Sequence, residues 1–257
     1  MVAADEGRAV VLLVDTFNRW FEPENARAAE RVLRRAGYTV HAATAPGDKH
    51  PLCCGRTFLA AGLVEEARNE ARRTLAALRP FVERGVPIVG LEPSCLLTLR
   101  DEFTVLLPGP ETKALAERAM LFEEFVAVEA EAGRFVLPLH ALPQQSALLH
   151  GHCHQKAFGT VGAVEKALRL VPGLAVKTLD STCCGMAGAF GYEVEHHDMS
   201  LKIGELGVLP AMREAPPDAL LVAGGTSCRH QIADGAGREA IHLAQVLDRA
   251  SAEGAVA

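Results

Sequence analysis

Residues 176–185 have the sequence Val-Lys-Thr-Leu-Asp-Ser-Thr-Cys-Cys-Gly, in which a short aliphatic strand pattern leads into two adjacent cysteines and a glycine. The first half carries the same motif at Cys53-Cys54-Gly55. In each half a helical pattern, an aliphatic strand and a Ser-Cys pair follow, ending at Cys95 and at Cys228. The interval from the second cysteine of the pair to this last cysteine is 41 positions in one half and 44 in the other. Such similar spacing indicates an internal duplication.

Outside the motif, aliphatic runs alternate with amphipathic helical patterns. The predicted strands cover residues 9–14, 38–43, 88–91, 146–150, 176–179 and 219–223. The predicted longer helices cover residues 23–36, 58–83, 111–132, 161–170 and 193–206. Alternation of this kind is typical of parallel sheets covered by helices. We therefore predict an α/β fold of two pseudo-symmetric repeats, each a small, mainly parallel sheet flanked by helices.

The junction between the repeats is predicted near residue 144, because residues 137–145 contain two prolines and little periodicity. This gives a first domain at 1–144 and a second at 145–257. A chain of 257 residues is long enough for two such domains. Only the second carries four cysteines; the first has Asp15-Thr16-Phe17 where the second has Cys153.

The overall composition is that of an ordinary globular protein, with 49% hydrophobic and 23% charged residues. A net charge of -6 without a basic tract gives no reason to expect nucleic acid as a partner. Residues 1–8 are short and polar, so we expect neither a secretory signal nor a membrane span, and place the protein in the cytoplasm. In a reducing compartment, seven cysteines are expected to be free, catalytic or metal-bound rather than paired as disulfides.

The cysteines all follow predicted strands. Open parallel sheets bind ligands beyond the carboxyl ends of their strands, so Cys153, Cys183, Cys184 and Cys228 are expected to converge. Four thiolates suit an iron–sulfur cluster or a closed structural zinc site. The neighbouring glycines would let backbone N–H groups approach the sulfur atoms. The alternative is that these cysteines are small buried hydrophobic residues.

In the first half, Cys53, Cys54 and Cys95 form an incomplete set, to which Asp15, His50, solvent or a substrate atom would add a fourth ligand. It is a candidate second site for a metal such as zinc, or a site of reduced thiols.

Around the main set, polar residues and a glycine are candidate secondary contacts. They are His152, His154, Gly185 and Arg229. The two histidines would donate hydrogen bonds to sulfur, or be ordinary partly buried residues. Arg229 would stabilise negative charge.

The repeated Cys-Cys-Gly with one cysteine before and one after it resembles the cysteine-rich CCG domain family. This family includes the B subunit of heterodisulfide reductase and the iron–sulfur subunits of glycolate oxidase and anaerobic glycerol-3-phosphate dehydrogenase. The segments 15–18, 21–24, 152–156 and 183–188 are more specific. They resemble the C-terminal region of flavin-linked iron–sulfur oxidoreductases that act on D-lactate, glycolate or D-2-hydroxyglutarate.

The resemblance implies an electron-transfer subunit or fragment of an oxidoreductase, working with a flavoprotein dehydrogenase or a ferredoxin-like iron–sulfur domain. The family motif ends in Cys-x-x-Cys, whereas Cys95 and Cys228 are each the only cysteine at that place. This favours a four-cysteine [4Fe-4S] cubane over a five-cysteine cluster. FAD is expected on a partner, because the chain has no Gly-x-Gly-x-x-Gly fingerprint. Association with a membrane would be peripheral, through a partner.

Two other functions stay open at this stage. One is a thiol–disulfide or persulfide reductase in which the first-half cysteines act on substrate sulfur. The other is a zinc-binding protein without a redox role.

Overall fold

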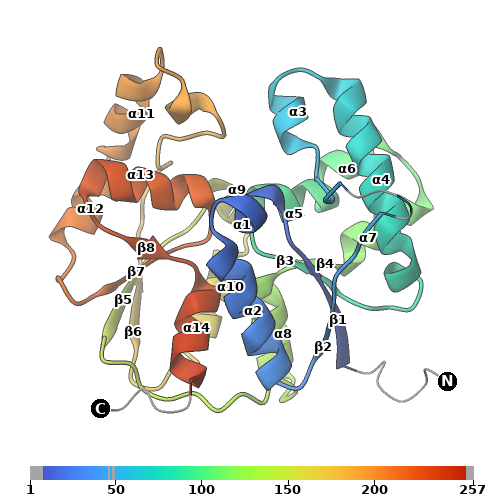
Figure 1. Cartoon of the computed structure of the whole chain (residues 1–257). Helices are drawn as coiled ribbons and strands as arrows, with labels where there is room; N and C mark the ends of the chain where they lie inside the picture. Colours follow the sequence, from blue (N-terminus) through green and yellow to red (C-terminus); the bar gives the residue numbers. More distant parts are fainter. Residues whose placement is uncertain (1–7, 46, 48–49, 253–257) are drawn as a thin grey trace. The chain divides into compact units, whose positions relative to one another are not determined.

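The computed structural model describes residues 8–45, 47 and 50–252, and the chain divides into two compact units, Met1–Leu137 and Pro138–Ala257 (Figure 1). The expectation for the N-terminal segment lies, for residues 1–7, outside the described residues. The link before the second sheet belongs to the second unit, where the His140 N–H donates to the Ala250 carbonyl at 2.8 Å.

The first unit contains a four-stranded parallel sheet in the order β2-β1-β3-β4. Its strands are β1 (Ala9–Leu13), β2 (Thr39–His41), β3 (Ile88–Gly90) and β4 (Ala119–Leu121). The central strands β1 and β3 are almost entirely buried, as expected of a sheet covered on both faces. The order reverses direction between β1 and β3, and in open parallel sheets ligands bind beyond the carboxyl ends of the strands at such a reversal.

The second unit repeats this arrangement in the order β6-β5-β7-β8, again with every pair parallel. Its strands are β5 (Ser146–His150), β6 (Ala175–Thr178), β7 (Leu220–Ala223) and β8 (Ala240–Ile241). Two four-stranded parallel sheets of matching order confirm the predicted fold class.

Helices connect the strands in both units. Those of the first unit are α1 (Thr16–Trp20), α2 (Pro23–Arg35), α3 (Arg56–Ala60), α4 (Val64–Val82), α5 (Pro93–Arg100), α6 (Glu102–Leu106), α7 (Pro110–Arg118) and α8 (Phe122–Glu131). Those of the second are α9 (Cys153–Ala157), α10 (Val161–Leu168), the 3-10 turn η2 (Phe190–Tyr192), α11 (His197–Gly204), α12 (Val208–Glu214), α13 (Thr226–Ala236) and α14 (Leu243–Ser251). Helix α10 contacts β6 and α14, whereas α13 contacts β7, β8, α11 and α12 (Figure 1).

Two expected helices are wrong in their extent. The helix expected at 111–132 is interrupted by β4, which pairs with β3. The helix expected at 58–83 is two helices, α3 and α4, because the chain adopts a left-handed conformation at Gly62, with φ of 76°. Glycine tolerates this conformation, and it ends a helix.

Candidate metal centre

Three neighbouring strand ends of the second unit deliver the four cysteines. Strand β5 leads through His152, which caps α9, to Cys153 at the first position of that helix. Strand β6 leads to Cys183 and Cys184, and Cys228 lies in the first turn of α13 after β7. Because β5 lies between β6 and β7, these ends meet at the reversal point of the sheet. Cys228 therefore lies inside α13, in its first turn.

The four cysteines form a row in which each side chain changes the pKa of its neighbour. The Cys153 and Cys184 thiols hydrogen-bond to Cys183 and lower its pKa strongly, while the same bond raises the pKa of Cys153. The pKa of Cys184 is raised by its contacts with Cys183 and then Cys228. The pKa of Cys228 is lowered, first by the hydrogen bond with Cys184. Side chains that change one another's pKa in this way lie close enough to act as one ligand set.

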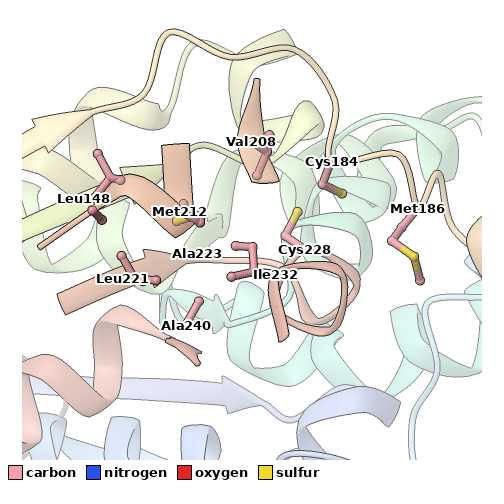
Figure 2. Packing of buried hydrophobic residues seen from close by; sticks show 11 residues of the cluster. Leu148, Cys184, Met186, Val208, Met212, Leu221, Ala223, Cys228, Ile232 and Ala240 are labelled. Carbon is pink, nitrogen blue, oxygen red and sulfur yellow. The ribbon is translucent and has the colours of Figure 1, made fainter. Parts of the chain in front are cut away.

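The burial of this set increases from one end to the other. Cys153 is exposed and Cys183 partly exposed, whereas Cys184 and Cys228 are buried. Figure 2 shows Cys184 and Cys228 side by side, next to the apolar side chains of Val208 and Ala223. An apolar wall of this kind keeps water from one side of the sulfur atoms.

The loop after the cysteine pair directs backbone N–H groups at the sulfur atoms. The Gly185 N–H donates to the Cys183 sulfur at 3.3 Å, and the Ala187 N–H also lowers the pKa of that cysteine. Gly185 has φ of 100°, and a Cβ atom at this position would lie 2.0 Å from the Ser200 carbonyl oxygen. Only glycine suits such a position. Non-glycine Ala187 also has a positive φ, 40°.

His150, the last residue of β5, was not predicted as part of the site. It is fully buried, and its Nδ1 lies 3.1 Å from the Ser181 hydroxyl. Among the described residues, its Nε2 has no hydrogen-bond partner. A nitrogen of His150 and the sulfurs of Cys184 and Cys228 all lie within 4.8 Å of one another. The sequence offers only a weak indication of this role, because a histidine at the end of a buried apolar strand is often just a hydrogen-bonded residue of the core.

The structure also shows where the residues predicted to surround the four cysteines lie. The His152 ring lies against Gly225, where a Cβ atom would come 2.4 Å from it, and its Nδ1 accepts the His154 N–H at 3.2 Å. Its position lowers the pKa of Cys228 further. Arg229 is 3% exposed and donates to the carbonyl oxygens of Ala223 and Gly224 at 2.8 and 2.9 Å. It places a buried positive charge one residue from Cys228.

The first unit repeats the cysteine geometry without a fourth thiol. Cys53 and Cys54 change each other's pKa, as do Cys54 and Cys95, so the three side chains lie close together. The Gly55 N–H donates to the Cys53 sulfur at 3.4 Å, as Gly185 does in the other unit. Hydrogen bonding to Cys54 and burial raise the pKa of Cys53. Its interaction with Cys54 lowers the pKa of Cys95, but burial and the negative charges of Asp15 and Glu92 together outweigh this and raise the pKa to about 11.

Asp15 contacts the start of its own helix. Its carboxylate accepts the N–H groups of Phe17 and Asn18 at 2.9 and 3.0 Å, which makes it the N-cap of α1. In the second unit the N-cap at this place is His152, and the next residue is Cys153. By this alignment Thr16 corresponds to Cys153. His50 lies in an exposed stretch, with its carbonyl accepting from Arg73.

Fold and site together define a class: a two-unit α/β protein with a cysteine-rich candidate metal centre at the strand ends of its second unit. The chain is 31% identical over 183 residues to the C subunit of anaerobic glycerol-3-phosphate dehydrogenase from Escherichia coli K12, covering 70% of this chain and 44% of that protein. It is 27% identical over 247 residues to D-2-hydroxyglutarate dehydrogenase of the same strain, covering 95% of this chain and 23% of that protein. The chain is 25% identical over 192 residues to lactate utilization protein A of Bacillus velezensis, and the match covers 72% of this chain and 75% of that protein.

The chain thus spans less than half the length of the first two relatives. No family model matches it. A crystal structure of a hypothetical protein from Helicobacter pylori aligns with a TM-score of 0.50 at 12% identity, covering 96% of this chain and 49% of that one, which supports the fold alone. Within the described residues, every helix is too short or too polar to cross a membrane.

Proposed function

We propose that this chain is the iron–sulfur electron-transfer component of a flavin-linked 2-hydroxy-acid oxidoreductase. A [4Fe-4S] cluster would be held by Cys153, Cys183, Cys184 and Cys228. The observation that carries the proposal is that the four cysteines, at three adjacent strand ends of one parallel sheet, lie close enough to change one another's pKa.

The surroundings of the four cysteines fit such a cluster. Four thiolates are its usual ligands, and hydrogen bonds to sulfur and burial are what tune it. Backbone N–H groups of the loop at Gly185 point at sulfur, and the buried guanidinium of Arg229 supplies positive charge nearby. When bound, the cluster would accept and release single electrons. The residues of the chain hold it, shield one side from water and offset its negative charge.

The names of two relatives support the substrate class, because D-2-hydroxyglutarate and lactate are both 2-hydroxy acids. The third name refers to glycerol-3-phosphate, which has no carboxyl group, and so supports an oxidoreductase alone. The electron donor would be a flavoprotein, with FAD on a partner chain or on another part of a longer polypeptide, and a ferredoxin-like domain would serve as a relay. The chain would work in the cytoplasm.

A zinc site is the second candidate, favoured by one observation. A tetrahedral zinc ion holds neighbouring ligand atoms roughly 3.3–3.8 Å apart, as follows from its bond lengths. The nitrogen of His150 and the sulfurs of Cys184 and Cys228, all within 4.8 Å, approach that spacing. A mixed histidine–cysteine set is also common for zinc.

The first-unit cysteines are the weaker site. A thiol that attacks a disulfide needs a lowered pKa. Cys53, Cys54 and Cys95 all have raised pKa values in the metal-free state, which opposes the thiol–disulfide reductase alternative. We propose that this trio, with Asp15 nearby, holds at most a zinc ion and takes no part in electron transfer.

Anaerobic iron, sulfide and zinc analysis, combined with electron paramagnetic resonance, tests these proposals. We expect about four iron and four sulfide atoms per chain, as for one [4Fe-4S] cluster. Cys184→Ser should lose most of both, whereas Cys54→Ser, which changes the matching cysteine of the other unit, should keep them. Stoichiometric zinc without sulfide would instead make this a zinc protein. Loss of turnover in Cys53→Ser or Cys95→Ser with an intact cluster signal would favour the thiol reductase.

A further inference from the structure

The two ring nitrogens of the buried His150 differ in their hydrogen bonding. Its Nδ1 lies 3.1 Å from the Ser181 hydroxyl, while its Nε2 makes no hydrogen bond of ordinary geometry among the described residues. The imidazole nevertheless interacts with the Cys228 thiol and contributes to the lowered pKa of that thiol. Because the side chain is fully buried, water does not provide the missing partner from bulk solvent. A buried polar atom without a partner is costly, and it often marks a place where an ion or another group binds.

The surroundings of His150 indicate what that partner is. A ring nitrogen lies within 4.8 Å of the sulfurs of both Cys184 and Cys228. Of the described histidine, cysteine and acidic residues, these three make the single group with ligand atoms so close together. The imidazole therefore faces the buried end of the cysteine row.

The internal duplication provides a direct comparison. His150 is the last residue of β5 and pairs with Ala223, the last residue of β7. In the first unit the corresponding position is Leu13, which ends β1 and pairs with Gly90 at the end of β3. Leu13 is also buried, with 8% exposure. The same place in the fold is thus held by Leu13 in the unit with three cysteines and by His150 in the unit with four.

We propose that His150 is a positioning residue for the cluster, donating its Nε2–H to a cluster-bound sulfur at Cys184 or Cys228. The Ser181 hydroxyl donates to Nδ1 and so fixes the proton on Nε2. The inference rests on the proposed function. A donor at sulfur stabilises the more negative, reduced state and therefore raises the reduction potential.

The test is the reduction potential of the His150→Leu variant, which introduces the residue that the first unit already has. We expect unchanged iron and sulfide content and a potential shifted to more negative values. The control is His242→Leu. His242 is an equally buried histidine of the same unit, but its Nδ1 accepts the Ala244 N–H at 3.0 Å as the cap of α14. Its loss should lower stability and leave the potential unchanged.

Two further measurements keep the inference testable if His150→Leu folds poorly. Ser181→Ala removes the partner of Nδ1 and should shift the potential in the same direction by a smaller amount. In the wild-type protein, exchange into D2O should produce, besides the deuterium couplings of the backbone N–H groups at Gly185 and Ala187, a further coupling in pulsed paramagnetic resonance that His150→Leu loses.

The outcomes separate the inference from the function. If His150→Leu and Ser181→Ala both keep an intact cluster with an unchanged reduction potential, the inference is overturned and the proposed function is not. Loss of iron on His150 substitution, with iron retained in His242→Leu, would make the imidazole a ligand and also overturn it. Wild-type protein that binds no iron–sulfur cluster overturns the proposed function, and the inference with it.

Discussion

Asp15 is the most perturbed carboxyl group of the first unit. It is 6% exposed and accepts hydrogen bonds from the backbone of Phe17 and Asn18 and, at 2.7 Å, from the Asn18 amide. Asn18 in turn accepts from Asn25 at 3.0 Å. Burial, and then the negative charge of Glu92, raise the pKa of Asp15 to about 6. These effects outweigh the hydrogen bonds, which favour the charged form.

This raised pKa predicts a pH dependence of stability. Because the folded-state value of about 6 exceeds the ordinary value of 3.8, the folded protein binds the proton more tightly than the unfolded chain. The stabilisation is fully present below pH 3.8 and is lost as the pH rises through 6, by about 3 kcal/mol for a difference of roughly two pK units. Asp15→Asn should flatten this slope, measured by urea unfolding between these pH values.

The exposed Asp101→Asn is the matched control for that experiment, because Asp101 precedes a helix without a side-chain cap bond. It should retain the wild-type slope. Equal slopes in wild-type protein and Asp15→Asn would contradict the assignment of the raised pKa to Asp15.

Strand β4 is an element that the sequence pattern did not predict, because its residues were expected to be helical. Residues 119–121 lie within an alanine-rich acidic stretch whose local preference is helical. Ala119 and Leu121 are instead buried at 3% and 0% exposure, and the strand pairs in register with Ile88–Gly90. Pairing with a strand about 30 positions away outweighs local propensity here, and such pairing is invisible in a local pattern.

Glu124 shows how the chain re-enters a helix directly after β4. Its carboxylate accepts the Leu121 N–H at 2.9 Å and both oxygens lie 2.8–2.9 Å from Arg100 of α5. A cap contributes about 1 kcal/mol and a partly buried charged hydrogen bond about as much or more. Glu124→Ala should therefore lower the free energy of unfolding by about 2 kcal/mol, measured by urea denaturation.

Glu30→Ala is the control for Glu124→Ala. Glu30 also pairs with an arginine, Arg34, but in an exposed i,i+4 pair on α2. Such pairs contribute about 0.5 kcal/mol or less. Similar losses in the two variants would show that the contacts of Glu124 with α5 and with the backbone of β4 add nothing.

Over the whole molecule, the two units differ in what their strand ends can bind. The four cysteines of the second unit come from segments as far apart as Cys153 and Cys228. A metal group that binds all four would cross-link three strand ends and would bind the folded state alone.

Removal of the metal group should therefore destabilise one unit selectively. Chelation is expected to lower the melting temperature by roughly 5–10 °C, which corresponds to a few kcal/mol of binding free energy in a protein of this size. Hydrogen exchange followed by mass spectrometry should show faster exchange within Pro138–Ala257. Exchange within Met1–Leu137 serves as the internal control. Equal acceleration in both units would contradict a single centre in the second.

The sequence by itself determined the two repeats and six of the eight described strands, and it predicted the set of four cysteines that the structure places at neighbouring strand ends. It could do so because aliphatic runs, helical periodicity and repeated Cys-Cys-Gly motifs are local patterns. Only the tertiary structure decided that β4 and β8 complete the sheets, since their short runs gain stability from a neighbouring strand alone. It also decided that His150, rather than a residue beside the motif, faces Cys184 and Cys228. That neighbourhood depends on the register of β5 against β7, which no local pattern encodes.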